Sequence, residues 1–149
     1  MNNTEEKNGS LTSLIGQWRL LSFDLENQQS GHKAPGFGPN PKGRLVILPG
    51  AFIIVLLTAA GRAAPKTDED RSAAFKQTIA YSGPFEIEGD LIKVKVDVTW
   101  NEAWGNTVQV RTFKIIGSRL HLVSAWAPSP IDPNTIVRGI LEWEREASH

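Results

Sequence analysis

The stretch that decides the fold is Gly16-Gln17-Trp18-Arg19-Leu20-Leu21-Ser22-Phe23-Asp24-Leu25, which predicts a strand entered through a glycine. Gly16 allows a sharp change of direction without a Cβ clash, and Trp18 brings a large ring to the point where the strand enters a core. A strand predicted at the far end, 136–145, carries Trp143 and an arginine two residues later. When an all-β chain closes on itself, its first and last strands become neighbours and no exposed edge is left to aggregate. The two stretches therefore predict a closed sheet.

Composition limits the classes of protein that this chain can be. Its 149 residues suffice for one domain with a sizeable core, which we place at 11–149. Sixteen basic and sixteen acidic residues cancel, so we expect no nucleic-acid partner, and the absence of Cys excludes disulfides and thiolate chemistry. The polar residues 1–10 are expected to be disordered and lack the apolar core of a secretory signal. The apolar run 51–60 is too short to span a membrane, so we expect a cytoplasmic protein.

Hydrophobic patterns predict a mostly antiparallel meander of eight strands and one helix. The helix begins at Thr67-Asp68-Glu69-Asp70, which resembles a capping box, and is expected to run to Ile79 with Phe75 and Ile79 on one face. We expect this helix to cover one end or side of the sheet. The irregular loop 27–41 is expected to lie over one mouth of a barrel. The strands are predicted at 18–26, 44–48, 51–57, 80–88, 91–100, 107–116, 119–126 and 136–145.

Two of these strands carry specific expectations. The strand 51–57 is apolar on both faces, whereas a strand with one wet face should alternate. Its outer face therefore needs cover from a helix, a loop or a second copy of the chain, which would make a homodimer. The strand 91–100 alternates, and its apolar side chains should share one face: Ile92, Val94, Val96, Val98 and Trp100.

Taken in order, these stretches resemble the lipocalin and calycin barrels, and more narrowly the small lipocalin-like domain proteins of bacteria and fungi. The resemblance implies an all-β fold: a closed or nearly closed antiparallel eight-stranded barrel with one short helix. Such a barrel holds either packed side chains or one small ligand, and it serves carriers and enzymes alike. The matching stretches are Leu14-Ile-Gly-Gln-Trp-Arg-Leu-Leu-Ser-Phe, Phe37-Gly-Pro-Asn-Pro-Lys-Gly, Ala73-Ala-Phe-Lys, Ala80-Tyr-Ser-Gly-Pro-Phe-Glu, Gln109-Val-Arg111 and Leu141-Glu-Trp-Glu-Arg145.

Aromatic side chains are the candidates for the wall of a ligand site. A barrel that binds a small molecule should be mainly apolar inside, with a few polar groups that orient the ligand. The alternative is that these rings simply plug the core. The candidate wall residues are Tyr81, Trp100, Trp104, Trp126, Phe113 and Phe52.

Three polar residues are the candidates for the chemistry. Gln109 and Arg111 share one face of their strand with Phe113, and an inward Arg would need a partner or an anionic ligand group because an unpaired buried charge is costly. Asp97 would act as a base or orient Arg111. The alternatives are that Gln109 and Arg111 face solvent and that Asp97 is merely on the polar side of its strand.

Three functions fit these patterns. The first is a cofactor-free enzyme that isomerises, cyclises or dehydrates a small, largely apolar molecule, and the resemblance implies polyketide or terpenoid intermediates. The second is a non-catalytic carrier or sensor with the same pocket. The third is a structural protein with a filled barrel that dimerises through 51–57. The sequence has no paired histidines at metal-ligand spacing and no nucleotide-binding motif, so we expect no metal and no cofactor.

Overall fold

A computed structural model of the chain describes residues 11–129 and 132–147, and the tail predicted at 1–10 lies outside these residues. A helical turn at 11–14 precedes the first strand. The elements that follow are β1 (Gly16–Asn27), β2 (Lys33–Pro35), β3 (Lys42–Leu48), β4 (Phe52–Thr58), α2 (Asp68–Lys76), β5 (Thr78–Glu88), β6 (Leu91–Lys95), β7 (Val98–Thr99), the 3-10 helix η1 (Glu102–Trp104), β8 (Val108–Ile116), β9 (Arg119–Ser124), β10 (Ala127–Pro128) and β11 (Ile136–Arg145).

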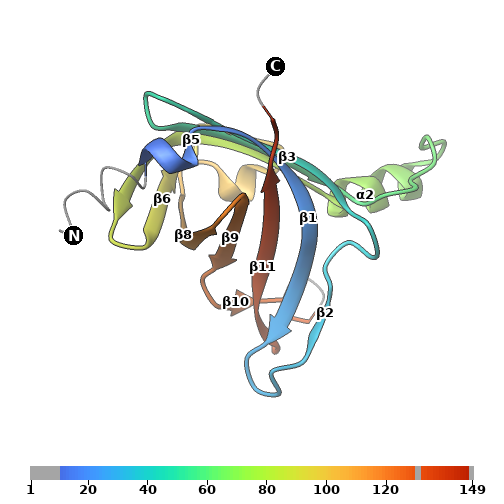
Figure 1. Cartoon of the computed structure of the whole chain (residues 1–149). Coiled ribbons are helices and arrows are strands. Elements are labelled where there is room, and N and C mark those ends of the chain that lie inside the picture. Colours follow the sequence, from blue (N-terminus) through green and yellow to red (C-terminus); the bar gives the residue numbers. More distant parts are fainter. Residues whose placement is uncertain (1–10, 130–131, 148–149) are drawn as a thin grey trace.

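The described strands form one closed antiparallel barrel, as predicted (Figure 1). Eight of them follow one another around the wall in the order β1-β3-β4-β5-β6-β8-β9-β11, and β11 pairs with β1 to complete the ring. The short strands are additions to this wall: β2 pairs with β1, β7 with β5, and β10 with β11. Each of these eight strands therefore has a neighbour on both sides over at least part of its length.

The closure is built around Trp18, as the sequence predicted. Trp18 lies opposite Arg145 in the β1–β11 ladder and is fully buried. Its indole N–H donates to the Leu14 carbonyl at 2.9 Å, which ties the helical turn at 11–14 to the end of the barrel. The Arg145 guanidinium donates to the carbonyls of Ile15 and Ser13. The turn, the first strand and the last strand are thus held together at one end of the barrel, where Leu14 is also fully buried.

The hairpin predicted from 44–48 and 51–57 is present as β3 and β4, but its outer face is not covered. Ile53 is buried against the core, whereas Ile54 and Leu56 are 45% and 48% exposed. The expectation of burial on both faces is therefore wrong for the single chain, because no described helix or loop lies over this part of the sheet. A second copy of the chain as its cover stays a prediction.

The strand predicted at 91–100 is broken in two. Ile92, Val94 and Val96 face the interior with 1% of their surface exposed. Val98 is 68% exposed, and the Trp100 indole donates to Phe75 of the projecting helix α2, so the inward position predicted for Val98 and Trp100 is wrong. The break follows from a change of partner, because β6 pairs with both β5 and β8 whereas β7 pairs only with β5. At the break the chain passes close to Gly83, where a Cβ atom would overlap the Lys95 carbonyl oxygen.

The helix α2 has the predicted start but a different end. The Thr67 hydroxyl accepts from the Asp70 N–H at 3.0 Å, and the Asp70 carboxylate accepts from the Thr67 N–H, which completes the capping box. The helix stops at Lys76, and Ile79 belongs to β5 instead. It buries none of its residues and projects from the barrel wall, so it does not cover the sheet as expected (Figure 1).

The loop between β1 and β3 returns to the barrel through Phe37. The Phe37 ring meets the inward-facing Phe23 ring edge-on, with 5.0 Å between ring centres. Gly36 fits directly against Phe23, where a Cβ atom would come within 2.5 Å of the ring. The absence of a side chain at Gly36 thus lets the loop reach the barrel.

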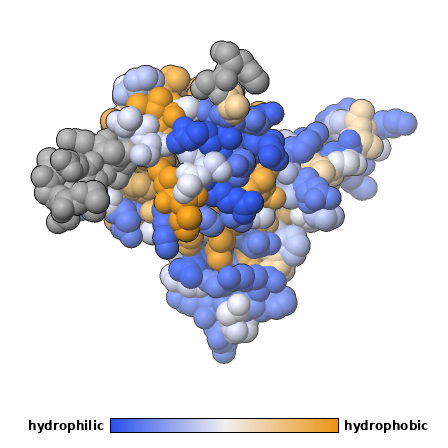
Figure 2. All heavy atoms as spheres, in the orientation of Figure 1, coloured by the Kyte–Doolittle hydropathy of each residue, from blue (hydrophilic) through white to orange (hydrophobic). Residues whose placement is uncertain are grey.

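The outer face of β1 and β11 is charged. Arg119 pairs with Glu142 at 3.0 Å and with Glu144 at 3.3 Å. Figure 2 shows hydrophilic residues over this face of the barrel. Among the helices that the structure describes, none has the length and apolar character needed to cross a membrane.

Candidate functional site

The side chains of Gln109 and Arg111 point into the barrel. In the β6–β8 ladder Arg111 lies opposite Ile92, and Gln109 lies opposite Val94. Residues directly opposite each other in an antiparallel pair share a face of the sheet, and both Ile92 and Val94 are buried in the core. The register therefore decides between the two alternatives that the sequence left open, in favour of the inward one.

Arg111 has only neutral partners among the described residues. Its two terminal nitrogens each donate to Gln109 Oε1 at 3.4 Å, and Nη1 also donates to the Val110 carbonyl at 3.0 Å. Gln109 is fixed in turn, because its Nε2 donates to the Thr107 hydroxyl at 2.9 Å. A guanidinium has five N–H donors, so these contacts do not exhaust it. The group is half-buried, positively charged and without a carboxylate, which favours an oxygen acceptor from outside the chain.

An aromatic wall stands beside this guanidinium. The Arg111 Cζ atom lies 6.0 Å from the centre of the Tyr81 ring and 5.8 Å from that of Trp104, at the limit of a cation–π contact. The Tyr81 and Trp104 rings are 5.4 Å apart, and Trp100 continues the row 5.1 Å from Trp104. Tyr81 is buried, whereas Trp104 and Trp100 are half-buried. We call Arg111, Gln109, Tyr81 and Trp104 the arginine site.

Local structure explains how Trp100 and Trp104 reach this place. Asn101 caps the short helix η1 by accepting from the Ala103 N–H at 3.0 Å, and this turn carries Trp104 back toward Tyr81. The Trp100 indole donates to the Phe75 carbonyl at 3.2 Å, so the end of α2 holds the outermost ring of the row. The sequence predicted these two rings at the end of a strand but not the turn that directs them.

The structure does not bring Asp97 together with Arg111. Asp97 is exposed, and its Oδ1 accepts from the Ser82 hydroxyl at 2.7 Å and from the Val98 N–H at 2.6 Å. Ser82 lies opposite Ile54, on the outer face of the sheet. The predicted role of Asp97 as a base or orienting partner is therefore corrected: it ties β7 to β5 from outside.

Two of the predicted wall residues also lie outside the barrel. Trp126 packs under Arg138, with 4.4 Å between the guanidinium carbon and the ring centre, and Arg138 pairs with Glu26 on the outer face. Phe52 precedes the inward Ile53 and therefore shares the outer face of β4. Their assignment to the ligand wall is corrected, because alternation fixes which residues share a face but not which face is inside.

Phe113 belongs to the core below the arginine site. It is buried and lies opposite Leu122 of β9, two residues along β8 from Arg111. It supplies apolar surface on the same inward face as the guanidinium. Its predicted contact with a ligand stays a prediction.

Sequence reasoning missed Ser124, which faces Arg111 from the other side. The β8–β9 ladder places Ser124 directly opposite Arg111. Its hydroxyl accepts from the Gly139 N–H at 2.7 Å and is within 3.3 Å of the Ala125 carbonyl, so it is held at the inner wall. The sequence could have indicated this position, because Ser124 alternates with Leu120 and Leu122 and therefore shares their face of the strand. Both leucines are buried.

The chemistry available at the arginine site is that of a cationic donor in an apolar surrounding. The site can hold a carbonyl or carboxylate oxygen at a fixed position, and Tyr81 and Trp104 can contact an apolar body attached to it. In residues 11–129 and 132–147 no group of three or more His, Cys, Asp or Glu side chains is arranged to hold a metal ion.

Comparison with known proteins agrees with this architecture. A protein-family model described as a lipocalin-like domain matches residues 15–146, which run from the end of the first helical turn through the last strand. No curated protein matches the chain.

Proposed function

Because the chain belongs to the lipocalin-like domain family, we propose that it carries or senses one small, largely apolar molecule, held at the arginine site. The barrel fold is consistent with small-ligand binding. In our proposal Arg111 donates to a carbonyl or carboxylate oxygen of the ligand, and the aromatic wall packs against the rest of it.

The observation that carries this proposal is the incomplete pairing of Arg111. A guanidinium that is partly removed from water loses hydration, and its only acceptors among the described residues are the Gln109 amide oxygen at 3.4 Å and the neutral Val110 carbonyl at 3.0 Å, which replace water incompletely. An oxygen acceptor on a bound molecule would restore short, charge-assisted hydrogen bonds, each worth about 1.5–3 kcal/mol. An arginine retained only for stability would be better served by a carboxylate on a neighbouring strand.

A second candidate function is cofactor-free isomerisation or cyclisation of a polyketide- or terpenoid-like intermediate. The inward Arg111 favours it, because a fixed donor can stabilise the enolate oxygen that develops in such reactions. The outward position of Asp97 removes the base that this hypothesis assigned. We therefore rank the carrier or sensor first and the enzyme second.

The test is to expose the protein to a small-molecule extract of cells, identify the retained compound by native mass spectrometry, and measure its affinity. We expect Arg111→Leu to weaken binding at least about tenfold, the loss expected for a charge-assisted hydrogen bond. Lys114→Leu, an exposed residue of the same strand, is the matched control and should bind like the parent.

The fate of the compound separates the candidates. A carrier or sensor returns it unchanged, whereas an enzyme converts it and loses about 10²-fold in turnover with Arg111→Leu. If Arg111→Leu binds the compound as tightly as the parent, the arginine site is not where it is held. If the parent retains no compound, the outcome contradicts the proposal that the protein carries or senses a small molecule.

A further inference from the structure

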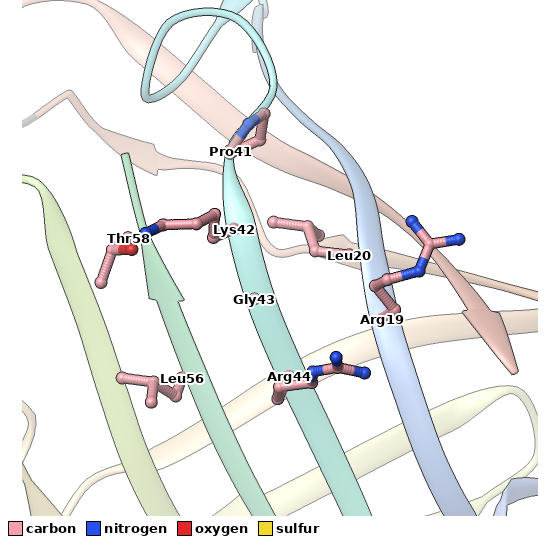
Figure 3. A pocket seen from close by; sticks show the side chains of 8 residues that line it. All are labelled: Arg19, Leu20, Pro41, Lys42, Gly43, Arg44, Leu56 and Thr58. Carbon is pink, nitrogen blue, oxygen red and sulfur yellow. The ribbon is translucent and has the colours of Figure 1, made fainter. Parts of the chain in front are cut away.

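A groove opens on the outside of the barrel where β1 and β3 part. The two strands pair only from Gly16–Arg19 against Arg44–Ile47, after which β1 follows β11 and β3 follows β4. The groove between them has a volume of about 390 Å³, within the range of small-molecule sites. Its lining comes from the exposed residues Arg19, Lys42, Arg44 and Leu56 and from Leu20, an inward residue of β1 that is only 4% exposed; no residue of the arginine site lines it (Figure 3).

The groove has an excess of positive charge. Three cations line it, Arg19, Lys42 and Arg44. Glu146 is the acceptor for both arginines, with Arg19 Nε at 3.5 Å and Arg44 Nη1 in direct contact. Among the described residues no carboxylate pairs with Lys42, so three cations share one carboxylate. The next acid along the wall, Glu144, is already paired with Arg119.

The same groove has an apolar side. Leu20 reaches from β1 toward β3, and Leu56 adds an exposed side chain from β4 (Figure 3). Gly43 allows this arrangement, because a Cβ atom there would lie 2.9 Å from the Leu20 Cβ and 3.1 Å from the Leu56 carbonyl oxygen. The missing side chain brings the β3 backbone against Leu20, and the groove forms between the parting strands.

We propose that this groove is a second binding site, for a small amphipathic anion. A phosphate or carboxylate head would accept from Lys42 and Arg44, and a short apolar chain would lie against the exposed Leu56. Lys42 favours this class of ligand because its ammonium is an unused point charge at the rim of apolar surface. The site is separate from the arginine site in both residues and position, so either can exist without the other.

The test is an NMR titration of the ¹⁵N-labelled protein with octyl phosphate, octanoate, inorganic phosphate and octanol. Octyl phosphate or octanoate should shift the amides of Gly43, Lys42 and Thr58. Inorganic phosphate lacks the apolar chain and octanol lacks the anionic head, so each should bind at least about tenfold more weakly. Higher salt should weaken binding of both amphiphiles. The two anions tell a phosphate head from a carboxylate head.

Variants decide whether the groove is responsible. Lys42→Gln should weaken binding of the preferred amphiphile about tenfold, and Lys114→Gln, an exposed cation on β8, should leave it unchanged. The shifts at Gly43, Lys42 and Thr58 should persist in Arg111→Leu, which separates this proposal from binding at the arginine site. The proposal is overturned if the groove shifts of Lys42→Gln titrate as in the parent, if the shifts gather only around Tyr81 and Arg111, or if the protein binds only vesicles of anionic lipid and not the monomeric amphiphiles.

Discussion

The guanidinium carbon of Arg145 lies 4.1 Å from the centre of the fully buried Trp18 ring, and the two residues are direct partners in the ladder that closes the barrel. The contact joins the first strand to the last. Because Arg145 also donates to carbonyls of the helical turn at 11–14, one side chain fixes three segments. Much of the stability of the closed barrel should therefore depend on this pair.

Trp18→Ala should lower the free energy of unfolding by about 3–5 kcal/mol, because it removes a buried aromatic ring and its cation–π contact. Trp126→Ala is the matched control, since Trp126 also stacks with an arginine at 4.4 Å but is 37% exposed. It should cost about 0.5–1 kcal/mol. Urea denaturation measures both. Equal losses for the two variants would contradict the central role of the closure.

Neighbouring lysine substitutions should separate the two faces of β4. Ile53→Lys places a charge in the core and should abolish cooperative unfolding, because Ile53 is 2% exposed. Ile54→Lys should change the free energy of unfolding by no more than about 0.5 kcal/mol in a monomer, because Ile54 is 45% exposed. Size-exclusion chromatography supplies the second readout. A parent that elutes as a dimer and an Ile54→Lys variant that elutes as a monomer would identify the second copy as the cover of this face.

Gly83→Ala should destabilise the barrel at the break between β6 and β7. The added methyl group would overlap the Lys95 carbonyl oxygen, which belongs to the backbone and cannot rotate away. Overpacking of this kind costs about 1–3 kcal/mol. Gly50→Ala, in the turn before β4 with open space around it, is the control and should melt like the parent. Unchanged melting of Gly83→Ala would show that the two strands can move apart freely.

The N-terminus of α2 should loosen in acid. The Lys66 N–H, and after it the Thr67 N–H, donates to the Asp70 carboxylate and lowers the pKa of Asp70 from its ordinary value. The Thr67 side chain lowers the same pKa further. A carboxyl group with a lowered pKa in the folded state stabilises the fold above its unfolded pKa, and this contribution is lost as the pH falls through the folded value. The protection factors of the Lys66 and Thr67 amides, which correct for the intrinsic exchange rate at each pH, should therefore fall below about pH 4.

Thr67→Ala gives the matching change in the capping box. It removes one of the groups that lower the pKa of Asp70, so the carboxyl group should titrate closer to its ordinary value in an NMR pH titration. Glu88 is the control, because Lys93 lowers the pKa of Glu88 at a distant turn. A Thr67→Ala variant in which Asp70 titrates as in the parent would argue against the capping box in solution.

Local patterns in the sequence determined the class of fold and several of its contacts. The entry of the chain through Gly16 and Trp18, together with the last strand, predicted the closure, since joining the first and last strands of an all-β chain removes its exposed edges. The capping box at Thr67 was also predictable, because its hydrogen bonds join residues three apart. Alternation identified Gln109, Arg111 and Phe113 as members of one face, because successive side chains of a strand point to opposite sides.

Only the tertiary structure decided which face was inside and where the walls part. Alternation is unchanged when a strand is turned over, so Arg111 became an interior residue only when the register set it opposite the buried Ile92. The same ambiguity misplaced Phe52, which shares its predicted apolar character with the inward Ile53. The break after Lys95 and the groove beside Gly43 arise where a strand changes partners, and pairing between strands depends on residues far apart in the chain. These pairings form only when the whole barrel closes, so a pattern within one segment of the sequence does not predict them.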